Sequence, residues 1–205
     1  MRFILLLLLL LGALAAGGPA AAQSWKEYSY PDDFFSVLLP AAPKIETTTY
    51  QVADGRSARA RVYSVNQDGA LLKVTVAELA DTGLDESAVI DHAIGTLAKD
   101  SDVKVNIPHR IDQVYGRQLS LTAADGSRST VALFDYKGRL YVIEGKARSG
   151  GGDATIDAMR FQQSLTFTGG DSNRSRDMIR AIRQGCPEVA NPAGLDDPRC
   201  HERRN

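Results

Sequence analysis

The chain has 205 residues, and its 24 basic residues nearly balance its 25 acidic residues, which gives a formal net charge of −1. Apolar residues make up 43% and charged residues 24%, a composition typical of globular proteins. The balanced charge argues against a nucleic-acid-binding protein that depends on bulk positive charge. Two cysteines and three histidines predict neither a disulfide-rich scaffold nor a metal cluster, and the length suits one domain with appendages.

The first 22 residues have the pattern of a secretory signal peptide. A basic residue is followed by an aliphatic run over residues 4–11 and by small residues that end in Ala20-Ala21-Ala22. We expect cleavage between Ala22 and Gln23 and a periplasmic or secreted location. The alternative is an uncleaved anchor, but the apolar run is short for a span of about 20 residues. No later segment is apolar enough to span a membrane.

Residues 23–169 predict one α+β domain built around an antiparallel β-sheet. Asp68-Gly69 and Lys137-Gly138 supply the positive φ angles of tight turns and predict β-hairpins. Pro108 is expected to end one strand and to leave His109 in a loop. Period-two alternation predicts the strands themselves, over residues 25–30, 35–39, 45–52, 57–66, 71–79, 103–107, 119–121, 131–136, 140–144 and 165–167.

Residues 84–99 change to helical spacing. Ile90, Ala93 and Ile94 fall on one apolar face, and Thr82 with Asp85 predicts a capping box at the start.

Residues 153–163 predict a second helix, with Asp153 as its cap. Two pairs at i,i+3 spacing, Ile156 with Met159 and Ala158 with Phe161, supply its apolar surface. Two helices placed among antiparallel strands predict an α+β fold with helices flanking the sheet, and not a series of βαβ units.

Residues 170–205 form a separate Arg-rich tail that contains no lysine. Residues 171–184 predict a short helix whose apolar stripe is Met178, Ile179 and Ile182. An amphipathic helix of this kind can dock in a groove or on an anionic surface, and the alternative is that it packs back on its own domain. The candidate partner contacts are the basic residues of this segment: Arg174, Arg176, Arg180 and Arg183.

The two cysteines, Cys186 and Cys200, both lie in this tail. In an exported protein they predict one intramolecular disulfide that closes the tail. A metal site with His201 is the alternative, but the spacing of the cysteines fits no standard zinc pattern.

Two stretches of the chain resemble PsbP-like domains. Tyr28 followed by Phe35-Ser36-Val37-Leu38-Leu39-Pro40 and Pro43 is similar to the opening strands of that family, and residues 158–167 resemble its final helix and strand. The resemblance covers residues 24–168. It implies an antiparallel sheet sandwiched by helices. Known members are mostly non-catalytic, and they include an extrinsic photosystem II subunit, a nuclear-import factor that binds a small GTPase and many secreted bacterial proteins. The resemblance carries over no catalytic residues.

Motifs for catalysis are absent from the sequence. It contains no G-x-x-x-x-G-K-[ST] phosphate loop and no G-x-S-x-G nucleophile elbow, so we expect neither a catalytic site nor a bound cofactor or metal. Asp32 and Asp33 are interpreted as a turn pair that caps or faces solvent, and His92 as solvated. Arg59 and Arg61 alternate with apolar residues, so we expect both on one solvent-facing side of a strand.

The sequence therefore predicts a secreted or periplasmic protein that is not an enzyme and binds an envelope protein or an anionic surface. The alternative is a small-molecule or lipid carrier with a cavity between sheet and helix. A hydrolase built around His109 ranks third.

Overall fold

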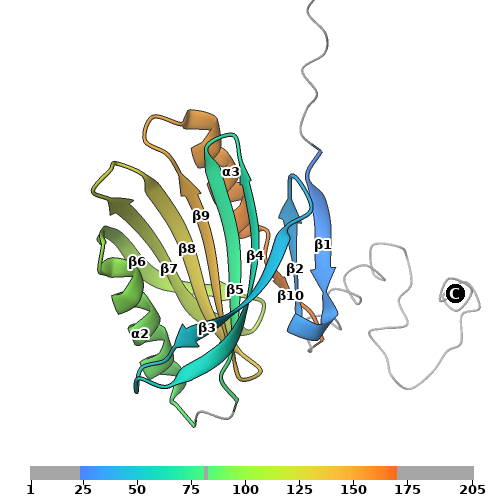
Figure 1. Cartoon of the computed structure of the whole chain (residues 1–205), viewed down its shortest axis with the longest axis vertical. Coiled ribbons are helices and arrows are strands. Elements are labelled where there is room, and N and C mark those ends of the chain that lie inside the picture. The colour runs from blue at the N-terminus through green and yellow to red at the C-terminus, as the bar shows by residue number, and fades with distance from the viewer. Residues whose placement is uncertain (1–23, 81–82, 170–205) are drawn as a thin grey trace, which may run out of the picture.

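The computed structural model describes residues 24–80 and 83–169 (Figure 1). The predicted signal peptide lies outside the described residues. So do the four tail arginines, Arg174, Arg176, Arg180 and Arg183, and the two cysteines, Cys186 and Cys200.

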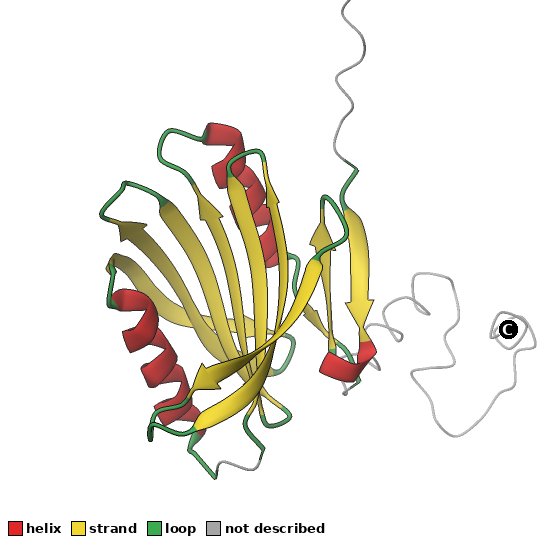
Figure 2. Cartoon of the chain, viewed as in Figure 1, coloured by secondary structure: helices red, strands yellow, loops and turns green. Residues whose placement is uncertain are grey.

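The described residues form ten strands and two α-helices, with a short 3₁₀ helix between the first two strands (Figure 2). In chain order these elements are β1 (Lys26–Tyr30), η2 (Pro31–Asp33), β2 (Phe35–Leu39), β3 (Lys44–Gln51), β4 (Ser57–Gln67), β5 (Ala70–Glu78), α2 (Glu86–Ala98), β6 (Ser101–Ile111), β7 (Val114–Ala123), β8 (Arg128–Tyr136), β9 (Arg139–Ala147), α3 (Gly152–Gln163) and β10 (Thr166–Phe167).

The strands form two antiparallel sheets. The larger has the order β3-β4-β5-β9-β8-β7-β6, and the smaller has the order β1-β2-β10. The predicted turns at Asp68-Gly69 and Lys137-Gly138 are present, and all four residues have positive φ. They join β4 to β5 and β8 to β9 in antiparallel register, with Gln67 opposite Ala70. The antiparallel α+β class predicted from the sequence is therefore confirmed.

The two faces of the seven-stranded sheet are covered by different elements. Along β8, Val131 and Leu133 pack in the cluster that includes α2, whereas Ala132 and Phe134 pack in the cluster that includes β2 and α3. Side chains alternate between the faces of a strand, so α2 covers one face and the β1-β2-β10 sheet with α3 covers the other. The molecule thus has three layers (Figure 1).

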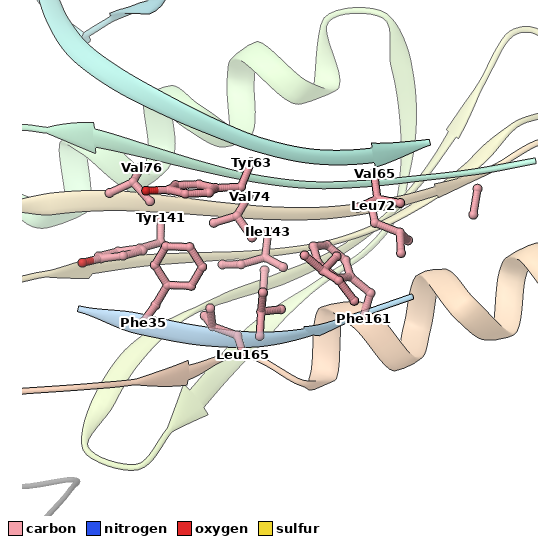
Figure 3. Packing of buried hydrophobic residues seen from close by; sticks show 14 of the residues in the cluster. Phe35, Tyr63, Val65, Leu72, Val74, Val76, Tyr141, Ile143, Phe161 and Leu165 are labelled. Carbon is pink, nitrogen blue, oxygen red and sulfur yellow. The ribbon is translucent and has the colours of Figure 1, made fainter. Parts of the chain in front are cut away.

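The layer made by β2 and α3 packs tightly on the large sheet. Figure 3 shows Phe35, Leu165 and Phe161 directed toward side chains of the large sheet such as Tyr141. All four are fully or almost fully buried. Burial of each such side chain contributes about 1.5–3 kcal/mol to the hydrophobic stabilisation of the fold.

A glycine allows α3 to approach β9 closely. A Cβ atom at Gly145 would lie 2.3 Å from the carbonyl oxygen of Ala158, which is far inside van der Waals contact. Gly145 therefore fixes how deeply α3 sits on the sheet.

Three local predictions are wrong. The strand expected to stop at Pro108 continues to Ile111, because β6 is an edge strand and one side of an edge strand needs no N–H donor. His109 therefore lies in a strand and not in a loop.

The predicted helix caps are also different in the structure. Helix α2 is capped by Asp85 itself, which accepts a hydrogen bond from the Ser87 backbone N–H at 3.1 Å. Helix α3 begins after Gly151 without the predicted side-chain cap from Asp153.

Among residues 24–80 and 83–169, neither helix has the length and apolar character needed to cross a bilayer.

Candidate interaction surface

Helix α3 has two apolar faces. Its predicted pair Ala158 and Phe161 is buried against the sheet, but its other predicted pair points outward: Ile156 is 59% exposed and Met159 is 43% exposed. Side chains three residues apart share one side of a helix, so the exposed pair forms a continuous apolar strip. Exposed apolar side chains that lie together can serve as a contact for another apolar segment.

A surface hollow of about 400 Å³ lies along this strip, between α3 and β2. We call it the α3 hollow, and its lining residues are Leu38, Ile156, Met159, Arg160, Gln163 and Ser164. The hydroxyl of Ser164 accepts a hydrogen bond from the Leu38 backbone N–H at 3.0 Å and donates one to the carbonyl of Phe161 at 2.7 Å. These bonds tie β2 to the end of α3 and fix the floor of the α3 hollow.

The lining of the α3 hollow includes one charged side chain, that of Arg160. The guanidinium of Arg160 lies over the ring of Trp25, 4.5 Å from its centroid, in a cation–π contact. On the same helix, Asp153 is exposed and Asp157 is half-buried. Neither carboxylate has an ion pair or a hydrogen bond from its side chain within the described part of the chain. The α3 hollow therefore combines an apolar floor with one positive charge, and α3 carries two acidic side chains outside the lining.

The other end of β2 is closed by a buried carboxylate. Asp33 in η2 is 1% exposed, contrary to the solvated turn predicted for it. Arg61 donates to it through Nη2 and through Nε at 2.6 Å, and the hydroxyl of Tyr63 also donates to it. The hydroxyl of Tyr141 donates to the backbone carbonyl of Asp33 at 2.9 Å. We call these four residues the Asp33 clamp, because they join η2 of the small layer to β4 and β9 of the large sheet.

The ionisation of the Asp33 clamp follows from these contacts. Burial by itself would raise the pKa of Asp33. Hydrogen bonds from Arg61 and Tyr63, with the positive charges of Arg61 and Arg139, outweigh burial and hold the pKa of Asp33 below its usual value of 3.8. Burial and the Asp33 charge raise the pKa of the Tyr63 hydroxyl, so Tyr63 stays protonated as a donor. The carboxylate is thus fixed in its charged form for a structural role.

Arg59 and Arg61 do not share the role predicted for them. Arg59 is exposed, as expected, but Arg61 turns inward to Asp33, and its Nη2 also lies 3.5 Å from a carboxylate oxygen of Glu78. The sequence interpretation of Arg61 as a solvent-facing side chain is therefore wrong, because Arg61 pairs with an acidic group of its own chain.

A second hollow, of about 690 Å³, lies between the start of α2 and β7 on the opposite side of the molecule. Its lining is mostly polar, and Tyr115 is 63% exposed beneath Arg110, whose guanidinium carbon lies 5.8 Å from the ring centroid. Nearby, burial and the charge of Glu86 raise the pKa of Asp135. The lining residues are Asp85, Glu86, Ser87, Ile90, Asp91, Tyr115, Gly116 and Arg117. Within residues 24–80 and 83–169, no three His, Cys, Asp or Glu residues are grouped to hold a metal ion.

The described histidines lie apart from one another and do different things. The Nε2 of His92 lies 3.0 Å from the backbone carbonyl of Gln51, so this ring joins α2 to β3. His109 is half-buried with its ring centroid 5.6 Å from that of Phe134, and burial lowers its pKa. Neither arrangement places a histidine beside a candidate nucleophile.

The fold is similar to that of a solved cyanobacterial protein. The solution structure of cyanobacterial PsbP (CyanoP) from Synechocystis sp. PCC 6803 matches with a TM-score of 0.49 and 13% sequence identity, over 76% of this chain and 99% of that chain. The PsbP-like resemblance predicted from the sequence is therefore found again among solved structures, and at this level of similarity it concerns the fold alone. No protein-family model matches the chain, and no curated protein matches it.

Sequence reasoning missed the two features that distinguish this layer. The Asp33 clamp joins residues 28 to 108 positions apart, so no local motif reveals it. The outward position of Ile156 and Met159 was also missed, although the signal was present. Two i,i+3 apolar pairs displaced by two positions along one helix cannot both face the same sheet.

Proposed function

We propose that this protein is an extracytoplasmic accessory module without catalytic activity, which binds a protein partner through the α3 side of its domain together with the Arg-rich tail. In this organisation residues 1–22 are a cleaved signal peptide, residues 23–169 are the folded domain and residues 170–205 are the tail. The observation that carries the proposal is the exposed apolar strip of Ile156 and Met159 beside the α3 hollow.

The shape of the described surface supports a protein-binding module over a small-molecule carrier. A carrier needs an enclosed apolar cavity that buries most of its ligand. The space between α3 and the large sheet is instead filled by side chains such as Phe161 and Leu165 (Figure 3). The α3 hollow and the hollow beside α2 both open to solvent, which suits side chains presented by another protein.

The charge of the tail indicates the chemistry of the partner. Residues 174–183 contain four arginines and one acidic residue, Asp177. Four positive charges beside an apolar strip fit a partner protein with an acidic surface and an apolar anchor at its centre. We therefore expect an acidic envelope protein rather than a nucleic acid, which the balanced charge of the chain does not favour.

A pull-down from envelope extract with the full chain as bait tests this proposal. Ile156→Glu should remove specific partners from the bound fraction, because it places a charge in the apolar strip. The matched control is Ile45→Glu on β3, where the side chain is 53% exposed and is not among the residues that line the α3 hollow. Equal loss in both variants, or in neither, would contradict a contact through α3.

The arginines supply a second arm of the same test. Changing Arg174, Arg176, Arg180 and Arg183 to Gln should weaken binding and flatten its dependence on salt, because exposed charge pairs are screened by ions. If vesicles of anionic lipid alone retain the protein, its partner is a membrane surface and not an acidic protein. A turnover assay that reveals efficient catalysis would displace the binding-module interpretation altogether.

A further inference from the structure

No described residue covers the α3 hollow, although apolar side chains form its floor. Leu38, Ile156 and Met159 present apolar surface to solvent, and the Ser164 hydrogen bonds fix the position of β2 beside α3. Apolar surface of this kind gains free energy when another apolar segment removes it from water.

The chain itself contains a segment of matching character. After Gly169 it continues for 36 residues (205 minus 169), and residues 171–184 predict a helix with the stripe Met178, Ile179 and Ile182. A helix of about this length is marginal in water unless its apolar face packs against something. One contact between the segment and the α3 hollow would therefore remove the apolar surface of both from water.

The segment is long enough to reach the α3 hollow. Strand β10 runs antiparallel to β2, and the Thr168 backbone N–H donates to the carbonyl of Phe34 at 2.8 Å, so the chain leaves the domain beside Phe34. Leu38 lies four residues further along β2, a distance of about 13 Å at 3.3 Å per residue. Residues 169 and 170 can span about 7 Å when extended, and a helix rises by about 10 Å between residues 171 and 178, so together they exceed that distance.

The charges also match. In a helix over residues 171–184, Arg174 and Arg183 would flank the apolar stripe on its two sides, and Arg176 and Arg180 would lie away from it. With the stripe seated on α3, the flanking arginines lie at the border of the α3 hollow, where α3 carries the exposed Asp153 one turn before Ile156.

We propose that residues 171–184 pack their apolar stripe into the α3 hollow, so that Arg176 and Arg180 point outward from a composite surface made by α3 and the tail. The docking deepens the proposed function and rests on it only for the role of the outward arginines. It explains why α3 carries an apolar pair on the side that faces away from the sheet.

Methionine provides a direct probe of this contact. The chain contains three methionines: Met1 in the predicted signal peptide, Met159 in the α3 hollow and Met178 in the stripe. In the full chain labelled with ¹³C at methionine methyl groups, we expect a nuclear Overhauser contact between the methyl groups of Met159 and Met178. Ile182→Glu should abolish this contact and shift the Met159 signal, whereas the control Arg180→Gln should leave both unchanged.

Three outcomes would overturn the docking. The first is absence of the Met159–Met178 contact, with the same Met159 signal in the Ile182→Glu variant as in the unsubstituted chain. The second is a contact that appears only between differently labelled chains, which would assign the α3 hollow to a second copy. The third is a Met159 signal that changes only when envelope extract is added, which would assign the α3 hollow to the partner.

The docking and the proposed function can fail separately. Loss of the methyl contact with retained sensitivity of partner binding to the four arginines would remove the docking and keep the function. An intact methyl contact with an unchanged partner profile after the arginine substitutions would keep the docking and remove the function.

Discussion

The two sides of the layer formed by α3 and β2 differ in how they are used. On the inner side, Phe161 and Leu165 are buried, Gly145 lets α3 sit close to β9, and the Asp33 clamp joins the layer to the large sheet. On the outer side, Ile156 and Met159 are exposed beside an open hollow.

This difference separates residues that hold the fold from residues that are free to contact another segment. Substitutions on the inner side should lower the free energy of unfolding. Substitutions on the outer side should leave it almost unchanged and alter binding instead.

Asp33→Ala is expected to have the largest effect. It leaves the guanidinium of Arg61 and the hydroxyl of Tyr63 without the carboxylate that they share. Removing one partner of a fully buried pair costs about 3–5 kcal/mol, and the 24% exposure of Arg61 lowers the cost below that range. Urea unfolding at pH 7 measures the change. Asp32→Ala is the matched control, because Asp32 is the adjacent acidic residue and is exposed. Equal effects of the two substitutions would contradict the Asp33 clamp.

The pH dependence of stability should report the same carboxylate. Asp33 titrates near 3.9 in the unfolded chain and below that in the folded protein, so the unfolded chain takes up the proton first as the pH falls. The stabilisation is therefore complete at pH values well above about 3.9 and is lost as the pH falls through the lower folded pKa. The difference in unfolding free energy between the unsubstituted chain and Asp33→Ala should shrink between pH 5 and pH 2. A constant difference over this range would show that the charge of Asp33 contributes nothing.

Gly145→Ala should have an intermediate effect on the inner side. The new methyl group would meet the Ala158 carbonyl at 2.3 Å and force α3 outward, at a cost of about 1–3 kcal/mol. Gly95→Ala on α2 is the control, since nothing lies within 4 Å of its added Cβ and alanine favours a helix by about 1 kcal/mol. Thermal unfolding should therefore move in opposite directions for these two glycines, and a shared direction would contradict the close approach at β9.

Ile156→Gln and Met159→Gln should change the free energy of the main unfolding transition by less than about 0.5 kcal/mol, because on the domain itself both side chains are exposed and only the proposed tail contact covers them. Partner capture by these variants should nevertheless fall. A loss of stability comparable to that of Gly145→Ala would show that these side chains hold the fold, as the residues on the inner side of α3 do.

Replacing Cys186 and Cys200 by Ser should have the smallest effect on the domain. The predicted disulfide lies beyond the described residues, and closing a loop of its size stabilises the loop itself by about 3 kcal/mol in the chain-entropy model. We expect looser tail residues in hydrogen exchange and a nearly unchanged main melting transition. Free thiols in the oxidised native protein would refute the pairing, and collapse of the whole fold in the double variant would refute its confinement to the tail.

Local chemistry made much of this fold predictable. The Asp68-Gly69 and Lys137-Gly138 turns and the alternation around them predicted the central hairpins, and helical spacing predicted α2 and α3 to within a few residues. The division of the strands into two sheets was not predictable, because it depends on pairings such as β10 with β2, which are 130 residues apart at Thr166 and Ser36.

The surface features were harder to predict for a different reason. An aspartate beside a proline has the same local pattern whether it faces solvent or a distant arginine, and only the packing of η2 on β4 decides between them. For the apolar pairs of α3, the spacing shows that only one pair can face the sheet, and the orientation of the helix decides that Ile156 and Met159 are the pair that faces outward.

The position of Pro108 also governs how the large sheet could grow. Its two open edges are β3 and β6, and the nitrogen of Pro108 in the middle of β6 has no hydrogen to offer an incoming strand. Strand β3 has no proline and presents an uninterrupted row of backbone donors and acceptors along Lys44–Gln51. Any extension of the sheet by another chain, in a crystal or an aggregate, is therefore expected to proceed from β3, which makes the sheet a template with one growing end.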